Sequence, residues 1–323
     1  MLRLLLFTLF LGAACAAPPP SPDWDDQMSL ALSARGKTLA EQGDLEAGRS
    51  LATEALTLAR SCGSLRAQAR SLALMAWIDR SYSAAEEALQ LTADEPDSVE
   101  IWDLRLLLAE LALSKPPSKT PAGLHWALLA LGHAEAVIKP ANLTENLPIR
   151  AEYEGTARHL AARAHRLLGD QARATYEERQ AALVLTLLPN EALPALRQSV
   201  FQGRGDDLAR EGAFQEAFVH HVQAQMLAEQ LGDHEAEMTS MAGRSTDLAG
   251  LGRLLDASQM ALTLANLALS REHTTVARDS AQRGLAWLDA QDPFGYKSLR
   301  LSLLTCLREI DAITGIPPRG SGE

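Results

Sequence analysis

The chain has 323 residues, of which 47% are apolar and 22% are charged, and its formal net charge is −11. The apolar content excludes a disordered chain. The acidic balance argues against a nucleic-acid partner and against polybasic binding to anionic lipid, because both need a basic surface.

The N-terminal segment has the order of residues that an export signal needs. Met1-Leu2-Arg3 carries one positive charge, residues 4–14 form an apolar stretch broken only by Thr8, and Cys15 follows. About 11 apolar residues are too few to span a bilayer, which favours a secretory signal over a membrane span. We therefore expect a signal peptide over 1–14, and a lipidated Cys15 with a Pro-rich tether over 15–26.

Residues 11–15, Leu-Gly-Ala-Ala-Cys, resemble a lipobox. The resemblance implies a bacterial lipoprotein in which Cys15 becomes the diacylated first residue, so that a membrane is contacted through the N-terminal lipid anchor. The expected location is then the membrane, facing the periplasm or the cell surface. Two alternatives stay open: an ordinary signal cut after Ala16, which gives a secreted protein, and no export.

From residue 27 to residue 314 the pattern predicts helix after helix, without the β-branched alternation typical of strands. Glycine suits the left-handed residue after a helix and Asp suits the following N-cap, so helices are predicted to end at Gly43, Gly169, Gly212 and Gly252. Further signals are a capping box at Ser83 and Glu86, an N-cap at Thr120, and a helix end at Lys139-Pro140. Residues 315–323 are expected to form a flexible tail.

The chain also repeats itself. Residues 29–60 align with residues 198–229, and seven positions agree in size class, including Gly36 with Gly205 and Gly48 with Ala217. Gly169, Gly212 and Gly252 are 43 and 40 residues apart, and Gly43 lies 126 residues before Gly169, which is three steps of 42. A step of about 42 residues is within the range of helical repeats. The repeating unit is therefore a helix pair of this length, present about seven times.

These repeats resemble the tetratricopeptide repeat, which has a small residue, a bulky residue three positions on, a turn, and a second helix with small residues at fixed positions. The best matches are LALSARGKTLAEQGDLEAGRSLATEAL and SVFQGRGDDLAREGAFQEAFVHHVQAQ. The resemblance covers residues 27–314 and implies an all-α, right-handed α-solenoid of about seven antiparallel helix pairs. The small residues are expected where the two helices of a pair cross closely.

A search for catalytic and metal-binding motifs finds none. The sequence holds no HExxH, GxSxG, Walker-type GxxxxGK[ST] or CxxC motif. His220 and His221 are adjacent, so they point about 100° apart on a helix, and we expect one to pack and the other to be exposed. Cys62 and Cys306 are interpreted as packed small residues. We therefore expect no catalytic residue, no metal and no cofactor.

A solenoid of this type implies a concave groove lined by the first helix of each pair. By position, the candidate groove residues are Lys37, Arg105, His159, Arg163, Arg166, Gln202 and Asp206. Of these, His159, Arg163 and Arg166 recur at helical spacing and share one face. A local basic strip in an acidic chain suits a peptide carboxylate or an acidic segment.

The sequence therefore predicts a non-enzymatic, exported adaptor or assembly factor at the cell envelope, whose partner is a protein or a peptide. Envelope lipoproteins built from tetratricopeptide repeats are similar in size and layout. One alternative is a lipoprotein that binds a small ligand or glycan in the groove, with Trp77, Trp102 and Trp126 as possible contributors. The other is a cell-wall hydrolase on a helical scaffold.

Overall fold

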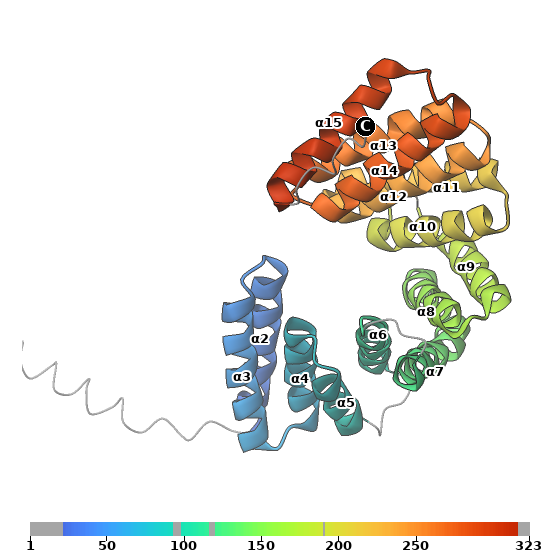
Figure 1. Cartoon of the computed structure of the whole chain (residues 1–323). Helices are drawn as coiled ribbons and strands as arrows, with labels where there is room; N and C mark the ends of the chain where they lie inside the picture. The colour runs from blue at the N-terminus through green and yellow to red at the C-terminus, as the bar shows by residue number, and fades with distance from the viewer. Residues whose placement is uncertain (1–21, 93–97, 116–119, 190, 316–323) are drawn as a thin grey trace, which may run out of the picture. The chain divides into compact units, whose positions relative to one another are not determined.

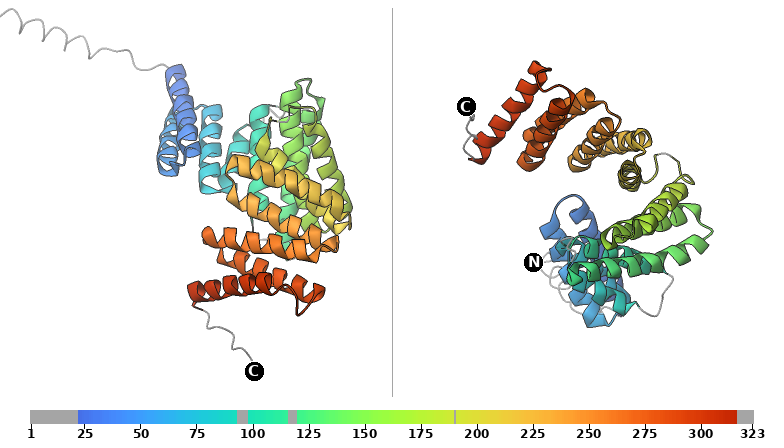
Figure 2. Two further views of the ribbon diagram at one scale, coloured as in Figure 1. Left: turned by 90° about the horizontal axis from the view of Figure 1, so that it is seen from above. Right: turned by 45° about the vertical axis from the view of Figure 1, so that its right-hand side comes forward.

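The computed structural model describes residues 22–92, 98–115, 120–189 and 191–315. Every regular element in this part of the chain is an α-helix (Figures 1 and 2). The fourteen helices are α2 (Pro22–Glu41), α3 (Leu45–Cys62), α4 (Leu65–Asp79), α5 (Tyr82–Leu91), α6 (Val99–Leu113), α7 (Pro121–Leu143), α8 (Leu147–Leu168), α9 (Gln171–Leu185), α10 (Pro194–Arg210), α11 (Phe214–Leu231), α12 (His234–Gly250), α13 (Leu254–Ser270), α14 (Thr274–Gln291) and α15 (Lys297–Thr314).

The helix starts confirm the predicted repeat length on average. The first helix of the first pair begins at Pro22 and that of the seventh pair begins at Thr274, so the mean step is about 42 residues. Single steps vary, because the step from Leu65 at the start of α4 to Val99 at the start of α6 is much shorter than the next step, to Leu147 at the start of α8. The chain is thus an all-α helical repeat in which the repeat length varies from pair to pair around its mean.

The chain divides into two compact units, residues 1–118 and 119–323. In the first unit, the apolar core forms where α3, α4, α5 and α6 meet, with Leu56, Leu72 and Leu104 in one cluster. In the second, the largest cluster joins α12 to α15 and contains Leu264, Leu288 and Leu303. Because one helix pair cannot bury its apolar face alone, each helix is stabilised by its neighbours within its own unit. The boundary between the units falls between α6 and α7, the two helices of the third pair in chain order.

Several predicted turns are confirmed by their backbone geometry. Gly43 and Gly169 have φ of 93° and 83°, and the Asp that follows each accepts a hydrogen bond from a backbone N–H of the next helix. Thr120 caps α7 as predicted. These signals are local, so one sequence suffices to read them.

Three boundary predictions are wrong. The helix α2 begins at Pro22, inside the segment 15–26 that we expected to be a tether, because Pro is tolerated in a first helical turn and Asp25 and Asp26 favour a helix N-terminus. Ser81, and not Ser83, caps α5. The helix α7 continues through Pro140 to Leu143. The signal-peptide residues, Cys15 and the tail from residue 316 lie outside the described residues.

None of the described helices is long and apolar enough to cross a membrane. Both Cys62 and Cys306 are free thiols. Cys306 is buried, as predicted, and burial together with Glu309 raises the pKa of its thiol. Cys62 is only half-buried and contacts the carbonyl of Ala59.

The two helices of the first pair cross where both residues are glycine, as the repeat pattern predicts. A Cβ at Gly48 would lie 2.9 Å from the carbonyl oxygen of Gly36 and 2.9 Å from the Cβ of Ala40. By contrast, a Cβ at Gly132, on the exposed side of α7, meets nothing within 4 Å. The same substitution should therefore have opposite effects at these two positions.

We expect Gly48→Ala to lower the free energy of unfolding by about 1–2 kcal/mol, because overpacking outweighs the gain in helix propensity. Gly132→Ala should raise it by up to about 1 kcal/mol, since only the propensity gain acts there. Urea unfolding followed by circular dichroism measures both changes. Equal effects at the two sites would contradict the close crossing of α2 and α3.

Candidate functional site

A groove of about 850 Å³ opens in the first unit, and it is lined mainly by α2, α4 and α6. These are the first helices of three consecutive pairs, which is where the repeat pattern places the groove. Along α4, the row Leu65, Ala69, Ala73 and Trp77 lines it at intervals of four residues. At about 1.5 Å per residue this row is about 18 Å long.

The walls of the groove are apolar as well. Leu30 and Ala34 of α2 and Leu104 and Leu107 of α6 line it. Trp77 is 37% exposed, so its indole is accessible to an occupant. An accessible apolar trough bordered by a few polar groups is the usual character of a ligand site.

Charged side chains border the groove in two groups. At the N-terminal end of α4, Arg66 and Arg70 each donate from Nη2 to the same oxygen, Oε1 of Glu100, at 2.8 and 2.9 Å. These two hydrogen bonds lower the pKa of Glu100 to about 2. In the second group, on α2, Nζ of Lys37 lies 3.8 Å from Oε1 of Glu41.

Of the predicted groove residues in this unit, Lys37 lines the groove. Arg105 lies half-buried on α6 and is not among the residues that line it. Trp77, which we considered as a contributor, does line the groove, whereas Trp102 is buried. The arginine pair at Arg66 and Arg70 was missed, although two arginines four residues apart on a predicted helix were a readable signal.

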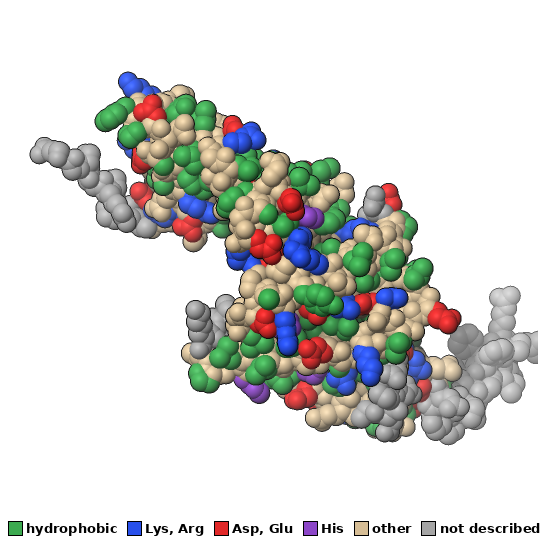
Figure 3. Space-filling view, turned by 90° about the vertical axis from the view of Figure 1, so that its right-hand side faces the viewer, with side chains coloured by type: hydrophobic (Ala, Val, Ile, Leu, Met, Phe, Trp, Pro, Cys, Tyr) green, Lys and Arg blue, Asp and Glu red, His purple; other side chains and the backbone are tan. Residues whose placement is uncertain are grey.

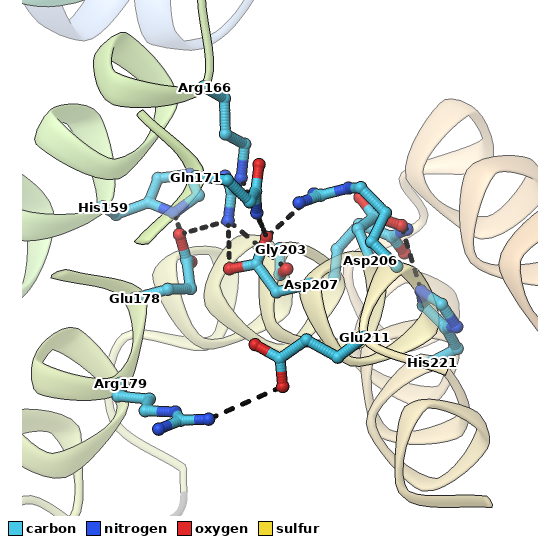
Figure 4. Close-up of polar contacts among 12 residues, drawn as sticks. His159, Arg166, Gln171, Glu178, Arg179, Gly203, Asp206, Asp207, Glu211 and His221 are labelled. Carbon is cyan, nitrogen blue, oxygen red and sulfur yellow. Dashed lines mark hydrogen bonds and ion pairs between the residues drawn. The ribbon is translucent and has the colours of Figure 1, made fainter. Parts of the chain in front are cut away.

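In the second unit, two of the predicted residues, His159 and Arg166, belong to a buried ionic cluster that we define as His159, Arg166, Gln171, Glu178 and Asp207 (Figure 4). Nη2 of Arg166 lies 3.0 Å from Glu178 and 3.0 Å from Asp207, and both carboxylates are fully buried. His159 Nδ1 lies 2.8 Å from Glu178, and the Gln171 amide donates to Asp207 at 3.0 Å. This cluster ties α8 and α9 to α10.

Burial disfavours the charge on Arg166, but the hydrogen bonds and charges of Asp207 and Glu178 outweigh it and raise the pKa of the guanidinium. His159 and Arg166 therefore direct their polar atoms to other helices of the same unit. Arg163 lies half-buried on the same helix. A partner that bound His159 or Arg166 would have to compete with two buried carboxylates.

A second polar contact joins α10 to α11 and α12. His221 is 1% exposed, and its Nδ1 lies 2.6 Å from Asp247 and its Nε2 3.1 Å from Asp206. The predicted residue Gln202 donates to Asp206 at 3.1 Å and accepts from Ser240 at 2.8 Å. Gln202 and Asp206 thus contribute to contacts between helices.

The pKa values of the adjacent histidines are shifted in opposite directions. Burial opposes charge on His221, yet the hydrogen bonds to Asp206 and Asp247 outweigh it and raise its pKa to about 9. Burial, with the nearby charges of Arg204 and His221, lowers the pKa of His220. The prediction that one of the two packs is confirmed by His221, but His220 is half-buried and lies beside the ring of Phe201, so it is not the exposed residue that we expected.

Among the described residues, no group of three or more His, Cys, Asp or Glu side chains has the arrangement of a metal site. On the face drawn in Figure 3, acidic, basic and apolar side chains are interspersed, and neither sign of charge forms a large patch. The groove in the first unit is therefore the best candidate binding site, and the ionic cluster is built as an internal contact.

Of the comparisons with known proteins, only the one with solved structures finds similar proteins. No protein-family model matches the sequence, and no curated protein matches it either. Among solved structures, the apo form of RapI is similar over 88% of this chain and 99% of its own, with a TM-score of 0.59 and 11% identity.

Two further structures are similar. One is a signal transduction ATPase (STAND) protein with a tetratricopeptide repeat sensor from Pyrococcus horikoshii, with a TM-score of 0.62 and 11% identity over 91% of this chain and 45% of that chain. The other is a Rap protein complexed with competence and sporulation factor, with a TM-score of 0.54 and 14% identity over 88% of this chain and 76% of that chain. These similarities show the fold, a helical repeat of the tetratricopeptide type.

Proposed function

We propose that this protein is a non-enzymatic adaptor that binds an extended segment of a protein partner in the groove of α2, α4 and α6. The observation that carries the proposal is the apolar row on α4, about 18 Å long, within a groove of about 850 Å³. The similar Rap structure in complex with a bound factor adds support from the same fold.

The length of the apolar row on α4, about 18 Å, sets the length of an extended segment that could lie along it. An extended chain rises about 3.3 Å per residue, so five or six residues span the row.

We further propose that the protein is exported and anchored through a lipid on Cys15, as the N-terminal sequence indicates. Two acyl chains give a stable anchor. The adaptor role would then be exercised at the cell envelope. Incorporation of a labelled fatty acid into the wild-type chain, and its loss in Cys15→Ala, is the expected result.

The binding proposal is tested by filling the groove. Ala34 is exposed on α2 and lines the groove, whereas Ala31 is exposed on the same helix and does not. The probe is a display library of random hexapeptides selected on the wild-type protein. We expect Ala34→Trp to weaken the binding of the selected peptides at least tenfold, and Ala31→Trp to leave it unchanged.

Both variants carry the same added volume, so a difference between them reports the groove and not a general effect of Trp. Circular dichroism checks that both remain folded. If the library yields no binder, or if the selected peptides bind Ala34→Trp as tightly as the wild type, the proposal fails.

The groove volume also lies within the range of small-molecule pockets. Small compounds that raise the melting temperature of the wild type but not of Ala34→Trp would then favour the ligand-binding alternative.

A further inference from the structure

The contact between Glu100 and the two arginines stands at one end of the groove, and it joins two cations to one anion. Two guanidinium groups, from Arg66 and Arg70, converge on one carboxylate oxygen. Arg66 and Arg70 are one turn apart on α4, so their charges repel one another. Glu100 reaches them from α6, another of the helices that line the groove.

These side chains are open to solvent. The side chains of Arg66, Arg70 and Glu100 are 65%, 41% and 39% exposed. Ion pairs this exposed contribute little to net stability, since water and salt screen them and ordering the long side chains costs entropy. In the buried ionic cluster of the second unit the carboxylates are fully buried, and an incoming group cannot replace them without leaving a charge unpaired. Arg66 and Arg70 can therefore exchange Glu100 for another carboxylate at a small cost in free energy. The same exchange at Arg166 would leave a buried carboxylate unpaired.

The charges lining the groove are balanced, with Lys37, Arg66 and Arg70 against Glu41, Glu100 and Asp103. The protein's own carboxylates thus mask the basic groups that an acidic occupant would use. Among these carboxylates, Glu100 accepts from both arginines at once. Arginine binds carboxylates well because its planar group offers several N–H donors.

We propose that Glu100 is a built-in competitor for an acidic group of the bound segment, so that the groove selects segments with a carboxylate beside apolar side chains. The segment's carboxylate takes the place of Glu100 on Arg66 and Arg70, and its apolar side chains lie along Ala69, Ala73 and Trp77. This inference rests on the proposed function and adds to it the chemistry of the partner.

The test uses an acidic hexapeptide from the library and its neutral analogue, in which Asp or Glu is replaced by Asn or Gln. We expect the wild type to bind the acidic peptide more tightly than the analogue. Glu100→Gln removes the competing carboxylate but keeps the shape of the side chain. It should tighten the binding of the acidic peptide about fivefold or more and change the binding of the neutral analogue little. Arg70→Gln should abolish the preference and still bind the analogue.

Glu87→Gln is the matched control, because Glu87 forms an exposed ion pair with Arg60 at 3.3 Å and does not line the groove. It should change neither affinity. Equal binding of both peptides to the wild type, or no gain in Glu100→Gln, overturns the inference. That failure differs from failure of the proposed function, because peptide binding would still be lost in Ala34→Trp.

Discussion

Replacing Arg166 by Met is expected to lower the free energy of unfolding by about 3–5 kcal/mol, because the buried Glu178 loses its arginine partner and the buried Asp207 keeps only its contact with Arg210, at 2.8 Å, as a cation partner. Removing one partner of a buried ion pair costs far more than the pair itself contributes. Met keeps much of the side-chain length, so a cavity is not the main effect. Urea unfolding monitored by circular dichroism gives the change.

Two further variants make this result interpretable. Arg173→Met removes an exposed pair with Asp170 at 3.5 Å, and it should change the stability by less than about 0.5 kcal/mol. Arg166→Lys keeps the charge but loses the two-pronged contact with Asp207, so its loss should be intermediate. If Arg166→Met is as stable as the wild type, the ionic cluster does not hold α8 and α9 to α10, and Arg166 is free for the binding role predicted from the sequence.

The stability of the protein should fall by about 2–3 kcal/mol between pH 6.5 and pH 9 because of His221 alone. Its pKa is about 9 in the folded protein and about 6.5 in the unfolded chain. The folded state therefore binds more protons in this range, so its extra stability is complete below pH 6.5 and is lost as the pH rises through 9. Urea unfolding at a series of pH values measures this loss.

His221→Gln supplies the comparison, because Gln can donate a hydrogen bond but has no titration in this range. We expect the variant to be less stable at pH 6.5 and to lose less stability on going to pH 9. Direct NMR titration of the imidazole should give a pKa well above 7. A pKa near 6.5 for His221, or identical pH dependence of wild type and variant, would falsify the assignment of a buried imidazolium.

Sequence reasoning recovered the helix pairs and their turns because those signals are local. An Asp after a glycine, or a Thr before a proline, sets a helix boundary within a single turn, as at Asp44 and Thr120. The errors came where a neighbouring signal offset the expected one. The helix α7 contains Pro140 near its C-terminal end and continues to Leu143, so this proline does not end the helix.

The site was harder to predict because its partners are far apart in the chain. Spacing correctly places His159 and Arg166 on one face of α8, but it cannot show that Asp207, in the next helix pair, lies 3.0 Å from Arg166. The same holds for Glu100, which lies on α6 while the arginines that it contacts lie on α4. Charge type and helical face are readable from one sequence, whereas pairing between helices depends on how the helices pack.

Helix α10 limits how the sequence can diverge, because two of its glycines each accommodate a side chain from another helix. A Cβ at Gly203 would lie 2.7 Å from Oε1 of Glu178, and a Cβ at Gly205 would lie 2.5 Å from the ring of His221. A side chain at either position is therefore tolerated only if the facing residue becomes smaller in the same lineage. In homologous chains we expect these positions to vary in linked pairs, so that glycine is retained at 203 wherever Glu is retained at 178.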